Sequence, residues 1–345
     1  MDFQDVIDRW VAIESSDLHI KAPNPPMWRV HGDLVPVDKS EPLCEADVIA
    51  ITKFLVDGEE YEKFLDENEL DTAKTLDCGR RIRINVHRQS GGIGLALRLL
   101  PAEFFPLESL GISEKICTEI CELRKGLVLV TGATGSGKST TLASFINEIN
   151  ETRAEHIITI EDPIEYKHSS KRCLVTQREV GADTASFSES LRRALREDPD
   201  IVLVGEMRDL DTMRAALTLA ETGHLTFATL HTSTAVQTIT RIIGAFPANE
   251  QEQIRVQLAG VLKYVLCQQL IPRTDVKGRC LAAEILVANN AVLSLIRENR
   301  IHQMQSTMQT SSRLGMITLN QSLENLVNKG YITKETAQSY AIDKD

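Results

Sequence analysis

The stretch LVLVTGATGSGKST occupies residues 127–140 and decides the fold of the larger part of the chain. Its first four residues are apolar and predict a buried strand, and GATGSGKS at 132–139 fits the pattern G-x-x-x-x-G-K-[ST] directly behind that strand. A helical pattern follows, which is the strand–loop–helix context of a phosphate-binding P-loop. The sequence therefore predicts an α/β domain that binds a nucleoside triphosphate.

Each residue type in this loop suits a bound phosphate. Glycines let backbone N–H groups turn toward the β-phosphate, Lys138 can neutralise β- and γ-oxygens, and the Ser139 hydroxyl can ligate Mg²⁺. We expect ATP and Mg²⁺ as the cofactors. The predicted nucleotide-binding residues of the loop are Gly132, Thr134, Gly135, Ser136, Gly137, Lys138, Ser139 and Thr140.

Three more apolar segments, at 156–160, 201–204 and 225–229, alternate with helical stretches and predict a mainly parallel sheet buried on both faces. Ligands of such sheets bind at the carboxyl ends of the strands. One of these strands ends at Glu206, where we expect a carboxylate near Mg²⁺. Another leads into Glu161, Asp162 and Glu165, of which one or more should orient water or metal.

Composition limits the function classes. The chain has 345 residues, 42% hydrophobic and 25% charged, with a formal net charge of −11, so disorder is excluded and a nucleic-acid partner is not expected. The acidic N-terminus does not resemble a signal peptide, and no apolar run reaches the roughly 18 residues of a membrane span. Seven scattered cysteines indicate no disulfide framework. We expect a cytoplasmic protein.

The texture of the sequence divides the chain into four parts. Residues 1–100 begin with a helical apolar period and continue with alternating segments such as 81–86, which predicts a small α+β domain with an antiparallel sheet. Prolines at 101 and 106 indicate a linker over 101–112. The P-loop domain is expected over 113–288, and a predominantly helical region over 289–345.

The strand-end motifs taken together resemble the secretion ATPase superfamily and, within it, the PilT-type ATPases that retract type IV pili. The segments that carry the resemblance are DLHI at 17–20, PMWRVHG at 26–32, TIEDPIE at 159–165, LREDPD at 195–200, GEMRD at 205–209, TGH at 222–224 and TLHT at 229–232. The resemblance implies a PAS-like N-terminal domain before a RecA-like core.

The resemblance also implies roles for single residues. Glu165 would position or activate water and Glu206 would serve Mg²⁺ directly or through water, although the bare residues do not rank the two. His224 and His231 would contact the nucleotide or couple its state to neighbouring segments. Further residues expected at the nucleotide are Arg83, Arg98 and Arg241.

Family membership would further imply a homo-hexamer with sites at subunit interfaces. Its partner would be a pilus platform protein of the inner membrane, which the ATPase would reach from the cytoplasmic side without entering the membrane. A second pilus ATPase is left open as a partner.

The direction of force is not decided by the sequence. AVLSLIRE at 291–298 occupies the place of a retraction-type motif, but Leu293 and Ser294 depart from it. Retraction is the leading interpretation, and the alternatives are an accessory retraction paralogue, a pilus assembly or secretion ATPase, a nucleotide-dependent regulator that barely hydrolyses ATP, and a RecA-like nucleic-acid translocase.

Overall fold

The computed structural model describes residues 3–13, 15–30, 33–38, 40–90, 92–101 and 103–341, and it divides into two compact units, Met1–Glu103 and Phe104–Asp345. His31 and Gly32 of the N-terminal motif lie outside the described residues. The predicted class is confirmed: an antiparallel N-terminal sheet, a mainly parallel sheet and a helical C-terminal region.

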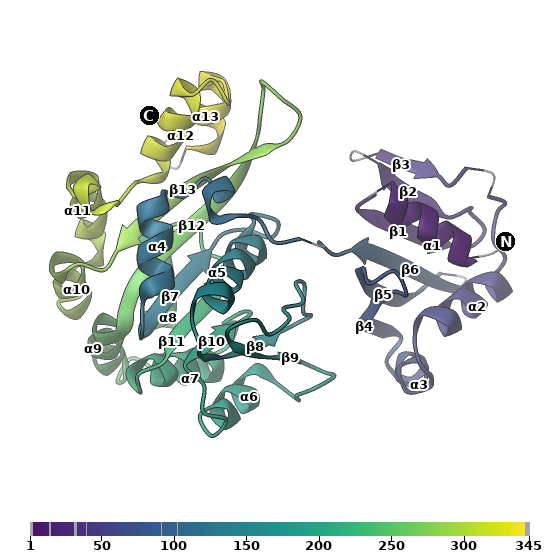
Figure 1. Cartoon of the computed structure of the whole chain (residues 1–345), viewed down its shortest axis with the longest axis horizontal. Coiled ribbons are helices and arrows are strands. Elements are labelled where there is room, and N and C mark those ends of the chain that lie inside the picture. The colour runs from purple at the N-terminus through teal and green to yellow at the C-terminus, as the bar shows by residue number, and fades with distance from the viewer. Residues whose placement is uncertain are drawn as a thin grey trace. The chain divides into compact units, whose positions relative to one another are not determined.

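The first unit is built on an antiparallel sheet of six strands in the described part, in the order β3-β2-β1-β6-β5-β4 (Figure 1). Along β5 the residues alternate, with Ile82, Ile84 and Val86 fully buried, because successive side chains of a strand point to opposite faces. The apolar face of α1 packs on this core through Trp10, as its helical period predicts. The elements are α1 Phe3–Ala12, β1 Asp17–Lys21, β2 Met27–Val30, β3 Asp33–Pro36, α2 Glu45–Leu55, α3 Gly58–Glu67, β4 Glu69–Thr75, β5 Arg81–Gln89 and β6 Gly92–Leu99.

The second unit contains a sheet of seven described strands in the order β13-β12-β7-β11-β10-β8-β9. All neighbours are parallel except β12 and β13, which form an antiparallel pair. The strands are β7 Gly126–Thr131, β8 His156–Glu161, β9 Leu174–Glu179, β10 Ile201–Val204, β11 Leu225–Leu230, β12 Leu262–Pro272 and β13 Arg279–Val287.

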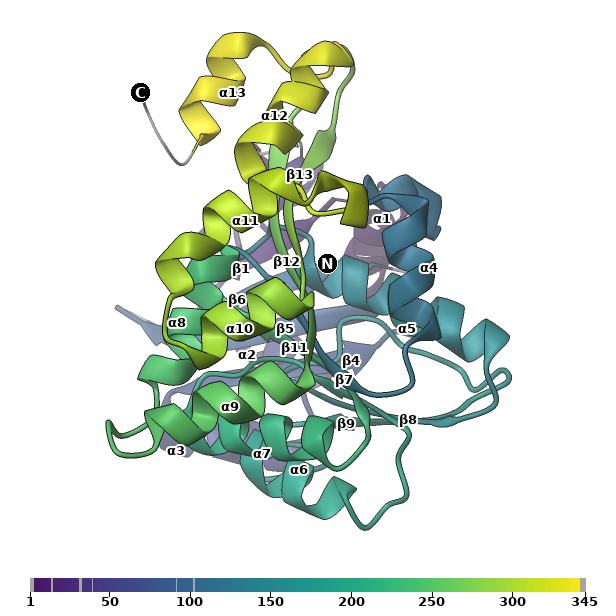
Figure 2. The same ribbon diagram turned by 90° about the vertical axis from the view of Figure 1, so that its left-hand side faces the viewer.

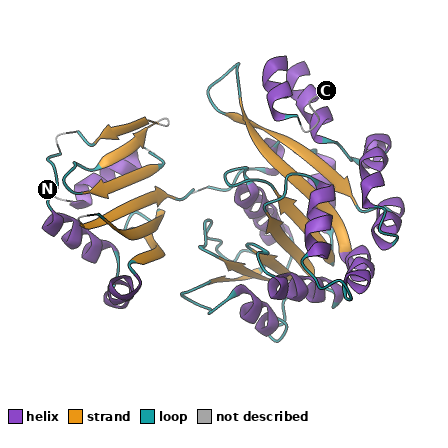
Figure 3. Ribbon diagram, turned by 180° about the vertical axis from the view of Figure 1, so that it is seen from behind, coloured by secondary structure: helices purple, strands orange, loops and turns teal. Residues whose placement is uncertain are grey.

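Helices cover both faces of this sheet (Figure 3). Successive residues of β7 show why its sequence is apolar throughout: Leu127 and Leu129 join one core cluster, and Val128 joins the other. The helices are α4 Glu114–Glu122, α5 Lys138–Thr152, α6 Phe187–Ala194, α7 Leu210–Glu221, α8 Ala235–Gly244, α9 Gln251–Val261, α10 Asn290–Arg297, α11 Met304–Thr310, α12 Leu319–Asn328 and α13 Lys334–Tyr340, with short 3-10 turns at Leu107–Leu110, Ile301–Gln303 and Ser312–Leu314.

Two features of this unit concern the predicted boundaries. Leu110 and Ile112, assigned by sequence to the linker, are buried in the core beside α4 and α5, so the unit includes them. After β13 the chain is helical, and α9, α10 and α11 lie side by side in Figures 1 and 2.

Candidate functional site

The P-loop connects β7 to α5 and its glycines take conformations that other residues avoid. Gly135 and Gly137 have φ of 76° and 91°. At Gly132 a Cβ atom would lie 2.4 Å from the carbonyl oxygen of Gln268, so a side chain cannot fit there. The loop therefore wraps closely around the beginning of α5.

Inside this loop the polar groups fit a bound phosphate. Nζ of Lys138 donates to the carbonyl oxygens of Gly132 at 2.8 Å and Ala133 at 3.1 Å. Ser136 Oγ is buried and has no hydrogen-bond partner among the described residues. Because α5 is 15 residues long and begins at Lys138, its free N–H groups and helix dipole also favour an anion here.

Glu206 follows the end of β10 at the same edge of the sheet. Its carboxylate forms an ion pair with Arg208 Nη2 at 2.9 Å and contacts His231 Nε2, an imidazole nitrogen, at 3.0 Å. Burial alone would raise the pKa of Glu206, but Arg208 and His231 outweigh it and the net shift is downward. Glu206 is therefore held ionised, as a metal-serving or water-orienting carboxylate must be.

The charges of two carboxylates act on the ammonium group of Lys138. Burial lowers its pKa, and the charges of Glu206 and Glu165 oppose that shift. The structure thus brings Lys138, Glu206 and Glu165 from three separate strand ends into one electrostatic neighbourhood, next to Ser139.

The segment after β8 holds Glu165 in place through its neighbours. The Ile164 N–H donates to Glu179 Oε2 at 3.0 Å, and the Tyr166 hydroxyl lies 2.9 Å from Thr140 Oγ1 on α5. Gln177 on β9 donates to the Tyr166 carbonyl oxygen at 2.9 Å. Glu165 therefore lies between two anchored residues.

Glu161, at the end of β8, is a third carboxylate at this edge. Burial raises its pKa to about 7, although hydrogen bonds from Thr159 at 2.6 Å and Gln177 at 3.2 Å favour the charged form. A cavity of about 40 Å³ lies beside it, lined among others by Ser139, Tyr166 and Gly205. That volume has room for a water molecule within reach of the P-loop serine.

Within the second unit, the structure does not bring every predicted residue to this edge of the sheet. His224 precedes β11, at the opposite end of the strand from His231, and it bonds the Leu219 carbonyl oxygen at 2.9 Å at the end of α7. Arg241 is exposed in the last turn of α8. Arg83 and Arg98 belong to the first unit, where they pair with Asp71 at 3.3 Å and Asp17 at 2.8 Å.

Sequence reasoning missed several functional neighbours. Arg208 lies two residues after Glu206 in the quoted motif, so its proximity to a strand end was a usable signal. Thr229 donates to the Gly205 carbonyl oxygen at 2.5 Å and joins the ends of β11 and β10. For Tyr166 and Gln177 no local pattern exists, since their partners come from other elements.

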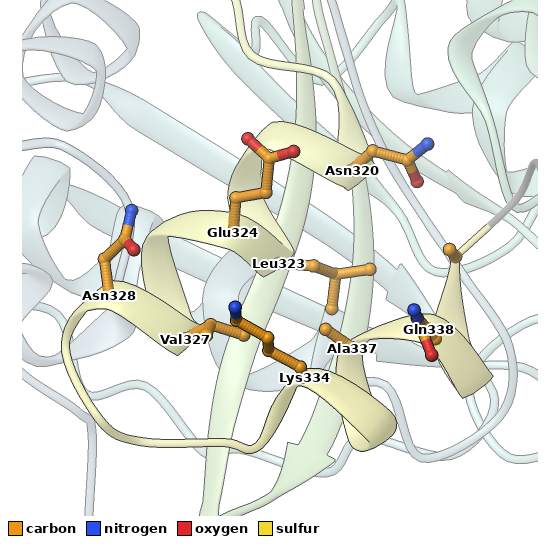
Figure 4. A pocket seen from close by; sticks show the side chains of 9 residues that line it. Asn320, Leu323, Glu324, Val327, Asn328, Lys334, Ala337 and Gln338 are labelled. Atoms are coloured by element: carbon orange, nitrogen blue, oxygen red, sulfur yellow. The ribbon is translucent and has the colours of Figure 1, made fainter.

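A separate hollow of about 460 Å³ lies between α12 and α13 (Figure 4). Its described lining mixes apolar residues such as Leu323 and Val327 with Glu324 and Lys334. It has no glycine loop like the one at the P-loop, so it does not compete as a nucleotide site. Among the residues 3–341 that are described, no cluster of three or more His, Cys, Asp or Glu side chains could hold a metal ion.

The segment compared with a retraction motif forms α10. Val292 and Ile296 are fully buried, whereas Arg297 and Glu298 are exposed at its end. Glu298 accepts from Ser294 Oγ at 3.0 Å and pairs with Arg300 at 2.5 Å. The apolar residues thus hold the helix in the core, and the two charged residues stand at its exposed end. In the described part of the chain no helix is long and apolar enough to span a membrane.

Comparison with known proteins gives a consistent result along the whole chain. The family model described as "Type II/IV secretion system protein" matches residues 4–338. The type IV pilus retraction ATPase PilT of Pseudomonas aeruginosa is 46% identical over 327 residues, which are 95% of this chain and 94% of that protein. The type IV pilus ATPase PilU of the same organism is 38% identical over 341 residues, covering 99% and 89%.

Solved structures agree with the sequence relatives. The crystal structure of the pilus retraction motor PilT with bound ADP superposes with a TM-score of 0.93 at 44% identity, covering 99% of this chain and 98% of that one. The fold described above is therefore shared with a protein of nearly the same length whose crystal structure holds ADP.

Proposed function

We propose, from the premise that this chain belongs to the type II/IV secretion system protein family and is an ATPase of the PilT type, that it hydrolyses ATP to power type IV pilus retraction and twitching motility. The single observation that carries the proposal is the convergence of Lys138, Glu206 and Glu165 at the P-loop edge of the sheet. That arrangement supplies phosphate binding and two separate carboxylates for the hydrolytic step.

Different residues of the site would have different roles in ATP hydrolysis. Lys138 would exchange its bonds to the loop carbonyls for the β- and γ-phosphate oxygens, and the Ser136 hydroxyl would find its partner there. Glu165 would orient the attacking water, since its flanking residues are anchored. Bound Mg²⁺ would supply charge neutralisation between the phosphates, with Ser139 and Glu206 as the residues that hold it directly or through water.

We assign the working form to a homo-hexamer. His224 lies at the opposite end of β11 from the P-loop edge, Arg241 is exposed in the last turn of α8, and Arg83 and Arg98 belong to the first unit. In a head-to-tail ring, such residues can complete a neighbouring subunit's site, because heterologous contacts place different surfaces of one chain against each other. A cation delivered in this way would stabilise the charge of the transition state.

The machinery around the hexamer follows from the proposed family role. The ATPase would lie in the cytoplasm, bound to the inner-membrane pilus machinery through a platform protein. The 46% identity over 95% of this chain to a protein named as a pilus retraction ATPase supports retraction rather than assembly. A second pilus ATPase remains a proposed partner.

The division of the chain is part of the same proposal. Residues 1–100 would be a PAS-like domain, 101–112 the predicted connection, of which Leu110 and Ile112 pack into the ATPase core, 113–288 the RecA-like ATPase domain and 289–345 the helical region with the retraction-type segment. The site residues would then be contributed by the first and third of these parts.

Turnover by the purified full chain tests the proposal. Wild type, Lys138→Ala and Glu165→Gln are compared for ATP hydrolysis with Mg²⁺, and the mass of the assembly is measured by light scattering. We expect a hexamer whose hydrolysis is lost in both variants. Normal turnover by either variant would overturn the site assignment, and stimulation by single-stranded DNA would favour a nucleic-acid translocase.

A further inference from the structure

Three aromatic rings form a stack at the beginning of the second unit. Phe104 is the first residue of that unit. The centroid of its ring lies 4.6 Å from the ring centroid of His168, with an interplanar angle of 22°, and 5.8 Å from that of Tyr166, with an interplanar angle of 26°. Tyr166 is 4% exposed and Phe104 is half-buried. Burial lowers the pKa of His168 to about 4, so a neutral imidazole faces the phenyl ring at pH 7.

Two of the three rings, Tyr166 and His168, belong to the segment 164–168 that also carries Glu165. On its inner side this segment is tied to β9, where Gln177 accepts from the His168 N–H at 2.7 Å and donates to the Tyr166 carbonyl oxygen at 2.9 Å. It is tied to the P-loop helix by the Tyr166–Thr140 bond at 2.9 Å. Phe104 packs against the rings of both residues.

These contacts link Phe104 through Tyr166 to Thr140 on α5. Phe104 is the first residue of the second unit and directly follows Glu103, the last residue of the first. Tyr166 follows directly on Glu165, and Thr140 follows directly on Ser139. The Phe104 ring therefore packs on a residue that is adjacent in sequence to Glu165 and hydrogen-bonded to the neighbour of Ser139.

We infer that Phe104 is a positioning residue for hydrolysis: its ring holds the segment 164–168 against β9 and α5 and thereby fixes Glu165 relative to the P-loop. The inference rests on the proposed function. Catalytic geometry is sensitive at this scale, because a misplacement of about 1 Å can cost on the order of 100-fold in rate. Loss of the ring should consequently lower kcat while nucleotide binding, which depends on the loop and Lys138, persists.

Phe105 supplies a matched control for this test. It is the neighbouring phenylalanine, it is 52% exposed, and its ring has no aromatic partner in the described part of the chain. Leucine at either position removes one ring from the same stretch of chain. Only the change at Phe104 also removes the stack on Tyr166 and His168.

The experiment measures kcat and KM for ATP and the affinity for a fluorescent N-methylanthraniloyl ATP, all on the full chain with Mg²⁺. We expect Phe104→Leu to lower kcat about ten-fold or more with affinity changed less than about two-fold, Phe105→Leu to match wild type, and Phe104→Tyr, which retains the ring, to recover most of kcat.

If Glu165→Gln is inactive, the proposed function stands and two results would overturn only the inference about Phe104. The first is an equal kcat in the two leucine variants. The second is a loss of both nucleotide binding and kcat in Phe104→Leu, which would indicate a merely structural role. Equal turnover by wild type and Glu165→Gln would instead overturn the proposed function, and this inference with it.

Discussion

His231 Nε2 lies 3.0 Å from Glu206 Oε1, which joins the loop after β11 to the carboxylate after β10. Arg208 bonds the other carboxylate oxygen of Glu206 at 2.9 Å. The two contacts fix the carboxylate in position at the P-loop edge. They also make Glu206 dependent on residues from two neighbouring strand ends.

Replacing His231 by alanine should therefore lower kcat without abolishing nucleotide binding. The carboxylate would keep Arg208 but lose its second restraint, and we expect a decrease in kcat of about ten-fold, the scale of a lost positioning contact. Steady-state hydrolysis and nucleotide affinity check this expectation. His302→Ala, at an exposed histidine of the 3-10 turn Ile301–Gln303, is the matched control and should match wild type in both measurements.

Lys138→Ala should abolish ATP binding or turnover. The ammonium group lies within the P-loop at 2.8 Å from the Gly132 carbonyl oxygen, and no other side chain of the loop residues 132–139 carries a positive charge. Isothermal titration with ATP and Mg²⁺ measures the effect. Binding and hydrolysis at the wild-type level would contradict the assignment of this loop.

Glu165→Gln should retain binding and lose hydrolysis. The amide preserves the size of the side chain but removes the charge that orients water. Because a positioned general base contributes about 100-fold or more to the rate, we expect hydrolysis to fall by at least that factor. The comparison of ATP affinity with single-turnover hydrolysis separates the two effects. A variant that binds ATP weakly but hydrolyses it at the normal rate would contradict the role given to Glu165.

Glu161→Gln should stabilise the nucleotide-free protein at high pH more than at low pH. The pKa of Glu161 is raised from 4.5 to about 7, so the folded protein holds this proton more tightly than the unfolded chain does. Wild type therefore loses stability as the pH rises from about 4.5 to about 7, by up to about 3 kcal/mol. Thermal unfolding at pH 5 and pH 8 measures it, and an identical change in Tm at both values would contradict the burial argument.

Much of the site could be predicted because its signals are local. Lys138 and Ser139 belong to one loop pattern, and Glu206 ends an apolar strand. The confirmed fold class follows in the same way from apolar strands such as β7, whose alternate residues enter two cores. Patterns of this kind require no knowledge of distant contacts.

The contacts that the sequence could not predict are those between residues of different helices and strands. His231 follows the carboxyl end of its strand, which a parallel sheet brings to the P-loop edge, but the contact of its ring with Glu206 depends on β10 being the neighbouring strand. Thr140 and Tyr166 are 26 residues apart and belong to no pattern. Leu110 was assigned to the linker because Pro101 and Pro106 precede it, whereas burial against α4 and α5 places it in the second unit.

Arg297 and Glu298 allow pilus function to be separated from hydrolysis. Both are exposed at the end of α10, while Val292 and Ile296 hold the helix in the core. Replacing either charged residue by alanine should leave ATP turnover within about two-fold of wild type, since exposed charges contribute little to stability, and should impair twitching. Equal loss of hydrolysis and motility would indicate that this segment only maintains the fold.

The measurement that tests the central claim most directly is the number of surface pili and the twitching of a strain whose chromosomal copy carries Glu206→Gln, beside a strain that lacks the chain. If hydrolysis at this site powers retraction, both strains have abundant surface pili and do not twitch. Cells without pili would contradict retraction and indicate assembly, and unchanged pili and motility would contradict a primary motor role.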